Sequence, residues 1–263
     1  MSTVSNFFEV LWSKPASGLT DGDKAVVLSW AGFRLRALGR LAEASQPMQA
    51  GMEASAQKGD WKGAAQDAGN LSELYLTLGE VSQAVASARQ SVDFADRSGD
   101  GFIKETSRTW LSNALLQAGE LIEAESLFRE AEAMQKKRTP EYPYRYSQSG
   151  FQFCDLLLSQ GQYQEVQKRA EKALDIVLHG SRNLLDIALN KLSLGRAFLL
   201  QALAETTARA LGASGQYFDQ ARDYLHQAVA GLREAGTQHA AKMNLPWPGP
   251  ISKKREKLPN AGR

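Results

Sequence analysis

The chain has 263 residues, of which 43% are hydrophobic and 23% are charged. This composition is that of a folded protein and argues against an intrinsically disordered or collagen-like chain. The formal net charge of +2 is unevenly placed, because residues 237–263 hold six basic residues and one acidic residue. The remaining 236 residues are therefore net acidic, which argues against nucleic-acid binding by the folded body.

Targeting and membrane signals are absent from the sequence. The first 11 residues lack a basic leader followed by a long apolar run, and no stretch approaches the roughly 18 apolar residues of a membrane-spanning helix. Cys154 is the single cysteine, so no internal disulfide can form, which indicates a reducing compartment. We expect a cytoplasmic protein with no membrane association, in which Cys154 is a buried core residue.

Residues 1–21 form the first predicted segment. They include Phe7, Phe8, Leu11 and Trp12. We expect these side chains to lie on a short helix that covers the exposed end of the structure that follows.

A period of forty residues then begins. Gly39, Gly79 and Gly119 are spaced at that interval, Gly59 and Gly99 repeat it, and Gly161 and Gly215 follow it more loosely. Self-similarity with a fixed period of 20–50 residues indicates an architecture of stacked repeats. Glycine just after a helix end supplies a left-handed cap, so we expect each of these glycines in a turn.

Small residues follow the turn glycines at fixed distances. Alanine lies five residues after the first three, and another small residue lies twelve residues after the first four: Gly51, Ser91, Ala131 and Ala173. Small residues one stripe apart let two helices approach closely. Apolar residues between the turns recur every three or four positions, which predicts amphipathic helices. We therefore predict five helix-turn-helix units, at residues 22–60, 61–100, 101–141, 142–182 and 183–236.

Three features depart from the period. Pro47 lies within the expected second helix of the first unit and should either kink that helix or delay its start. The interval from Gly161 to Gly215 is 14 residues too long, which predicts an overlong helix or a helix with a protruding loop. Residues 237–263 hold four of the eight prolines and the run Lys253–Lys257, which is typical of a disordered basic tail.

The repeat pattern resembles the tetratricopeptide repeat (TPR) in a long-helix variety. The family's eighth position is small, its twentieth is alanine and its twenty-seventh is small. The residues at the eighth position are Gly32, Ser72, Ser112, Cys154 and Gly195. Those at the twentieth are Ala44, Ala84 and Ala124, and those at the twenty-seventh are Gly51, Ser91, Ala131 and Ala173. The resemblance spans residues 22–236 and implies an all-α fold, a right-handed α-solenoid of about five TPR-like hairpins.

Several sequence segments also resemble the repeat arms of large bacterial proteins that carry a nucleotide-hydrolysing switch domain. Examples are Asn70-Leu71-Ser72-Glu73-Leu74-Tyr75 and Leu127-Phe128-Arg129-Glu130-Ala131-Glu132. This resemblance implies a sensor or docking arm of a bacterial signalling assembly. No glycine-rich phosphate loop ending in Lys-Ser or Lys-Thr occurs in this chain.

Catalytic patterns are missing, so we expect no enzyme, no cofactor and no metal. The three histidines are far apart in sequence, and no metal-binding or nucleophile motif is present. We therefore expect the chain to be a non-catalytic protein-interaction module that binds a protein or peptide partner. The first helices of stacked hairpins line the concave face, so the candidate binding residues are Gln66, Glu73, Thr109, Asn113, Gln148, Phe151, Asp155 and Arg196.

Alternatives remain at four places. A regulatory receptor that binds a small ligand within the superhelix is the second functional interpretation. The Lys and Asn pair that grips peptide carboxylates in this family is lacking at Ser29/Phe33 and Gly69/Glu73. The cluster Tyr142–Tyr146 suits repeat packing better than a binding hot spot. The basic tail could touch phosphates but is better read as solubilising, and the uncovered end of the stack leaves self-association possible.

Overall fold

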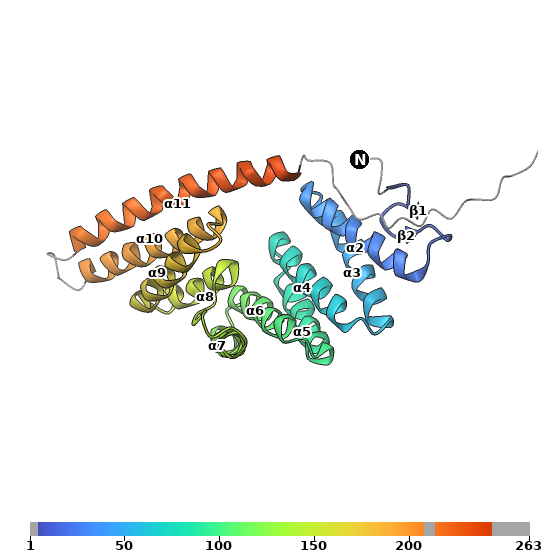
Figure 1. Cartoon of the computed structure of the whole chain (residues 1–263), viewed down its shortest axis with the longest axis horizontal. Helices are drawn as coiled ribbons and strands as arrows, with labels where there is room; N and C mark the ends of the chain where they lie inside the picture. Colours follow the sequence, from blue (N-terminus) through green and yellow to red (C-terminus); the bar gives the residue numbers. More distant parts are fainter. Residues whose placement is uncertain (1–4, 208–213, 244–263) are drawn as a thin grey trace, which may run out of the picture.

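The computed structural model describes residues 5–207 and 214–243. Within these residues, ten α-helices form five consecutive hairpins (Figure 1). They pair as α2 (Asp21–Ala37) with α3 (Leu41–Gln57), α4 (Trp61–Leu78) with α5 (Val81–Ser98), α6 (Gly101–Ala118) with α7 (Leu121–Arg138), α8 (Ser147–Ser159) with α9 (Tyr163–His179), and α10 (Leu184–Thr207) with α11 (Ser214–Met243). The predicted all-α solenoid of five hairpins is confirmed.

Capping residues set where the helices begin and end. The side chains of Thr20, Asp60 and Asp100 accept hydrogen bonds from the backbone N–H three residues ahead, at 3.2, 2.9 and 3.0 Å. These contacts satisfy donors that the first turn of a helix leaves unpaired. The predicted turn glycines Gly39, Gly79, Gly119 and Gly161 have φ between 72° and 83°, in the left-handed region. Pro47 lies inside α3, which starts at Leu41, so it does not delay that helix.

Small residues hold the two helices of each hairpin together. Ala44, Ala84 and Ala124 have no exposed surface. A Cβ atom added to Gly32 would lie 2.2 Å from Met48 Cγ, so the first helix of hairpin one approaches the second too closely for any side chain there. The small positions predicted from the sequence are therefore the helix contacts. A continuous apolar core extends from α5 to α10, and Phe128 stacks on Phe153 at 4.9 Å within it.

The N-terminal segment corrects one expectation. Residues predicted to form a capping helix instead include an antiparallel pair of short strands, β1 (Phe8–Val10) and β2 (Lys14–Pro15). Proline has no N–H and a fixed φ, so it suits the edge of such a pair better than a helix interior. Trp12, in the turn between the strands, packs against the cluster of Leu35, Ala44 and Leu74. The end of the stack is therefore covered by an aromatic side chain on a turn.

The fifth hairpin corrects two more expectations. Gly215 is the second residue of α11 and not a turn residue. The 14 extra residues lengthen both helices, since α10 has 24 residues and α11 has 30. Residues 208–213, where a protruding loop was an alternative, lie outside the described residues.

The predicted end of the repeats at residue 236 is also too early. Helix α11 continues through Thr237 to Met243. Residues 240–243, Ala-Ala-Lys-Met, favour helix, whereas Pro246 disfavours it in the residue before it. The Pro-rich basic tail, residues 244–263, lies outside the described residues. No helix in the described part of the chain is both long and apolar enough to cross a bilayer.

Asp67 on α4 joins the first two hairpins from a half-buried position. Its carboxylate accepts hydrogen bonds from Ser29 Oγ on α2 at 3.2 Å and from Ser55 Oγ on α3 at 3.4 Å. Burial raises the pKa of the Asp67 carboxyl to about 6. The ionised form is thus penalised in the fold, because two hydroxyl donors offset only part of the lost hydration.

We expect Ala124→Leu to destabilise the chain by ~1–3 kcal/mol, because the added atoms overpack a fully buried helix contact. Thermal unfolding checks this, with a melting temperature several degrees lower than in the wild type. Ile122→Leu, on the same helix at a side chain that is 90% exposed, is the matched control and should melt like the wild type. Equal melting temperatures for the two variants would refute the tight contact at Ala124.

We expect Asp67 to contribute a component that lowers the free energy of unfolding as the pH rises from about 4 to 6, opposite in sign to the contribution of carboxyls with a lowered pKa, such as Glu125. The raised pKa of Asp67 means that the folded chain binds more protons than the unfolded chain in this window. Asp67→Asn should remove this dependence and stabilise the chain above pH 6 by ~1–3 kcal/mol. Urea unfolding at pH 4.5 and 7.5 measures it. Asp93→Asn, at an exposed carboxylate paired with Arg97, is the control and should leave the pH dependence intact.

Candidate functional site

The first helices of the hairpins are linked along one face, which we call the inner surface; it consists of the exposed and half-buried residues of α2, α4, α6, α8 and α10. In Figure 1 the long helix α11 runs above these helices, whereas α5 and α7 lie on the opposite, outer side. Ser29 on α2 bonds Asp67 on α4, and Asp155 on α8 pairs with Arg196 on α10. Polar contacts between first helices therefore run from the first hairpin to the last.

Glu73 is the centre of the inner surface. Its carboxylate accepts hydrogen bonds from Arg36 Nη2 on α2 at 3.1 Å, from Trp110 Nε1 on α6 at 3.2 Å and from Gln148 Nε2 on α8 at 3.3 Å. Glu73 and Gln148 are 75 residues apart in sequence. One carboxylate on α4 thus ties together four first helices, and 20% of its side chain stays accessible.

A second polar contact lies nearer the C-terminal end of the inner surface. Arg196 Nη2 on α10 is 2.6 Å from Asp155 Oδ1 on α8, with 36% and 31% of the two side chains exposed. The pair is screened by water and contributes about 0–1 kcal/mol to stability. Its charges cancel, as do those of Arg36 and Glu73, so these two contacts add no net charge to the inner surface.

Carboxamide side chains accompany these charges. Gln66 and Gln148 are exposed and Asn113 is half-buried, on α4, α8 and α6 respectively. Gln66 Nε2 lies 3.4 Å from Asn70 Oδ1 on the same helix. Phe151 is half-buried on α8, one turn from Gln148. Each carboxamide offers both donors and an acceptor, the same groups that an extended peptide backbone needs.

Thr109 is the one predicted site residue that the structure removes from the surface. It is 1% exposed and accepts a hydrogen bond from Arg145 Nη2 at 3.1 Å. Helical periodicity placed it correctly on the inward side of α6, but the segment before α8 folds over it and inserts Arg145. The prediction that Thr109 contacts a partner is therefore wrong.

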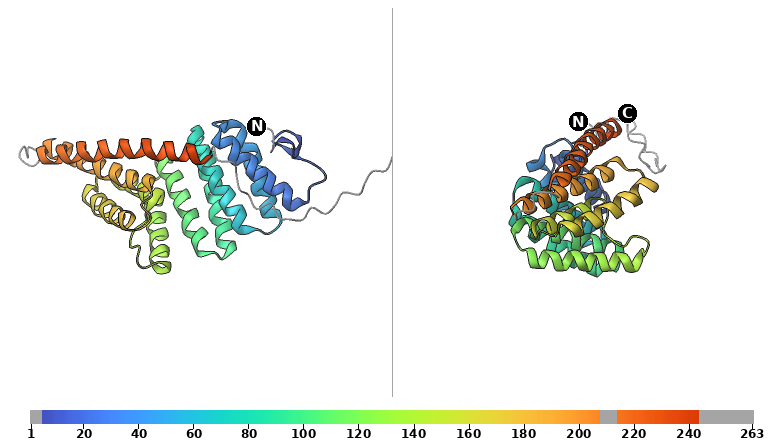
Figure 2. Two further views of the ribbon diagram at one scale, coloured as in Figure 1. Left: turned by 45° about the horizontal axis from the view of Figure 1, so that its top comes forward. Right: turned by 90° about the vertical axis from the view of Figure 1, so that its left-hand side faces the viewer.

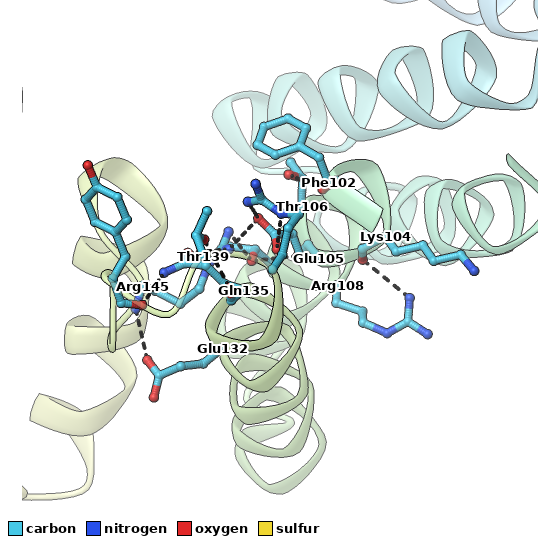
Figure 3. A network of polar contacts seen from close by, with 12 residues as sticks. Phe102, Lys104, Glu105, Thr106, Arg108, Glu132, Gln135, Thr139 and Arg145 are labelled. Atoms are coloured by element: carbon cyan, nitrogen blue, oxygen red, sulfur yellow. Dashed lines mark hydrogen bonds and ion pairs between the residues drawn. The ribbon is translucent and has the colours of Figure 1, made fainter. Parts of the chain in front are cut away.

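Arg145 belongs to a buried ionic network between α6, α7 and the segment before α8 (Figure 3). Its Nη1 atom is 3.3 Å from Glu105 Oε1 and donates to Gln135 Oε1 at 2.9 Å. Glu105 also pairs with Arg138 at 2.7 Å, and only 2% of Glu105 is exposed. Burial lowers the pKa of the Arg145 guanidinium, because the ion pair and hydrogen bonds of the network offset only part of the lost hydration.

The network extends to α9 through Glu132. Its carboxylate accepts from the backbone N–H of Arg145 at 3.0 Å and from both Nη atoms of Arg169 at 2.6 and 2.9 Å. The Arg169 guanidinium lies 4.7 Å from the ring centre of Tyr144 and 4.5 Å from that of Phe153. Arg145 and Tyr144 are therefore packing residues, as the preferred interpretation of the tyrosine cluster predicted.

Sequence reasoning missed Trp110 and Arg36 on the inner surface. A Cβ atom on Gly69 would lie 2.0 Å from Trp110 Cε3, so the indole ring of α6 lies against the backbone of α4. Gly69 is inside a helix and caps nothing, and such a glycine indicates a close approach by another group. The glycine inside α4 could therefore have predicted a large side chain such as Trp110 against this helix. No pattern in the neighbouring sequence predicted the contact of Arg36.

Two surface hollows lie away from the candidate residues. One of about 520 Å³ is bordered by Gly161–Glu165 and by Gln201, Ala204 and Glu205. The other, of about 440 Å³, lies between α3, α4 and α5 and includes Met52, Leu71 and Phe94. None of the eight candidate residues borders either hollow.

Side chains that could support chemistry are scattered or buried. Within residues 5–207 and 214–243, no group of three His, Cys, Asp or Glu side chains is arranged to hold a metal ion. Cys154 is 5% exposed, and burial raises the pKa of its thiol to about 12. The prediction that it is a buried core residue is confirmed, and the thiol carries little thiolate at neutral pH.

Comparison with known proteins gives matches in structure alone. No protein-family model matches the chain, and no curated protein matches its sequence.

Solved structures of similar fold are TPR-like. A putative kinesin light chain from Podosopora anserina with nearly identical TPR-like repeats is 18% identical, covers 84% of this chain and 99% of its own, and has a TM-score of 0.59. BtubC from P. vanneervenii is 16% identical, with coverage of 92% and 89% and a TM-score of 0.58. The apo form of RapI is 10% identical, with coverage of 84% and 87% and a TM-score of 0.58. The fold of this chain is therefore that of the TPR-type helical repeat proteins.

Proposed function

We propose that the chain is a non-catalytic docking module whose inner surface binds an extended segment of a partner protein. One observation carries the proposal: carboxamide side chains on α4, α6 and α8 accompany a carboxylate that links four first helices. Such a surface crosses three hairpins, which suits a peptide better than a compact metabolite. Peptide backbones need alternating donors and acceptors, and carboxamides supply both.

The two ion pairs of the inner surface indicate which kind of partner segment this surface can bind. Arg36 is paired with Glu73, and Asp155 is paired with Arg196. A strongly charged partner would have to break one of these pairs, whereas a polar segment of low net charge can bond to the exposed faces of both. We infer that the preferred segment has mixed polar and apolar residues, with Phe151 as an apolar contact.

A solved complex of the same fold supports the docking of a second molecule. One structure is a Rap protein complexed with competence and sporulation factor; it is 12% identical, covers 86% of this chain and 67% of its own, and has a TM-score of 0.57. The repeat phrases that resemble bacterial signalling arms extend the proposal: we infer that the partner belongs to a bacterial signalling assembly. A small-ligand receptor is less well supported, because the hollows of metabolite size lie away from the inner surface.

Peptides selected by display against the full chain test the proposal. The double variant Asn113→Ala with Gln148→Ala should weaken binding of the selected peptides by about tenfold, since each lost hydrogen bond costs ~0.5–1.5 kcal/mol. Fluorescence anisotropy with labelled peptides measures the affinity.

The matched control is Gln83→Ala with Gln90→Ala, which removes two exposed carboxamides from α5 on the outer side. This variant should bind the peptides like the wild type. Equal loss in both double variants, or loss in the α5 variant alone, would contradict docking on the inner surface. A thermal shift with a metabolite but with no peptide would favour the small-ligand receptor.

A further inference from the structure

Helix α2 carries a stripe of exposed apolar side chains. Val26, Trp30 and Phe33 follow one another at intervals of four and three residues, which places them on one face. Their exposed fractions are 53%, 38% and 56%, and the rings of Trp30 and Phe33 meet edge to face at 6.2 Å. Contiguous exposed apolar side chains over about two helical turns are typical of a binding site.

The stripe borders the inner surface at its N-terminal end. Phe33 lies four residues after Ser29 and three before Arg36, and both of these bond side chains on α4. The apolar stripe of α2 is thus continuous with the polar inner surface of α4. Whatever occupies the stripe lies at one end of the surface proposed to bind a partner.

The long helix α11, whose last residue is Met243, ends on the side of the molecule where α2 lies. Figure 1 and the left view of Figure 2 show α11 running from the α10 side across the molecule toward α2. The sequence after Met243 begins Asn-Leu-Pro-Trp-Pro-Gly-Pro-Ile. An extended chain spans at most about 3.5 Å per residue, so residues 244–251 can reach up to about 28 Å from Met243.

The chemistry of residues 245–251 matches that of the stripe. Leu245, Trp247 and Ile251 supply apolar side chains, and three prolines between them favour an extended polyproline conformation. Proline-rich segments bind to aromatic-lined surfaces, since little conformational freedom is lost. Val26 and Phe33 are seven residues apart, about 10 Å along α2 at 1.5 Å per residue, which matches three to four residues of such a segment at 3.1 Å per residue.

Charge favours the same arrangement. Residues 244–263 are net +4 and residues 1–243 are net −2, so the tail and the folded body attract each other. The first turn of α2 holds Asp21, which pairs with Lys24 at 3.0 Å, and Asp23, which accepts a hydrogen bond from Thr20. A segment that runs from Phe33 toward Val26 carries the basic run Lys253–Lys257 toward these two carboxylates.

We propose that residues 245–251 bind along Val26, Trp30 and Phe33, so that the chain supplies its own occupant for the N-terminal end of the inner surface. Trp247 is the aromatic anchor of this contact, and Asp21 and Asp23 face the basic run. The contact itself is independent of the partner proposed above. Its regulatory consequence, that the tail competes with an incoming partner segment, rests on the proposed function.

Photo-crosslinking in the full chain tests the contact. Phe33→p-benzoylphenylalanine keeps an aromatic ring at an exposed site, so the fold should persist, as thermal unfolding verifies. After irradiation, trypsin should yield a crosslink between residues 25–34 and residues 243–253 in the species of monomer mass. Its yield should not change on dilution, and Trp247→Ala should lower it by at least about fivefold, because a buried aromatic anchor dominates such contacts.

The control carries p-benzoylphenylalanine in place of Ile122, which is 90% exposed on α7. It should give no crosslink to residues 243–253. Three results would each overturn the proposal: no crosslink at Phe33, an equal crosslink from Ile122, or a crosslink found only between chains and lost on dilution. The last would assign the stripe to a second copy. Because no partner is added, failure of the docking proposal would leave this result unaffected.

Discussion

The close contact of two helices at small side chains is the constraint on which the rest of this structure depends. Ala44, Ala84 and Ala124 are completely buried, and Gly32 leaves no room for a Cβ atom against Met48. Because each hairpin closes at equivalent positions, successive hairpins present their first helices on the same side. The alignment of α2, α4, α6, α8 and α10 into one inner surface follows from that repeated contact.

The join between the third and fourth hairpins needs a different solution. Helix α8 has only 13 residues, and the eight residues before it form no helix. The buried network of Glu105, Gln135, Arg138 and Arg145 fills this place and fixes α8 on α6. Removing the Glu105 carboxylate would leave the buried Arg145 guanidinium without the ion-pair partner that it has in this network, which costs far more than the loss of an exposed pair. A specific polar network therefore replaces the regular apolar contact where the period is broken.

The functional proposals follow from how polar and apolar groups divide along the inner surface. Its middle, around Glu73, is polar and balanced in charge, whereas α2 presents exposed aromatic rings. The polar part suits a peptide backbone, and the aromatic part suits the Pro-rich segment of the same chain. Helix α11 connects the two ideas, because it runs from the α10 side toward α2, and the Pro-rich segment follows it in the sequence.

Periodic features of the sequence determined the fold by themselves. Glycine spacing located the turns of the first four hairpins but not that of the fifth, and the small residues located the helix contacts, because both depend on local backbone geometry and side-chain size. Tertiary structure decided what the repeat period alone cannot predict. The helical spacing of Thr109 predicts a place on the inner surface, but Arg145 covers this residue. The same holds for Glu73, whose partners come from three other helices, and for the strands around Trp12. Contacts between residues distant in sequence depend on how hairpins stack, and no local pattern encodes that.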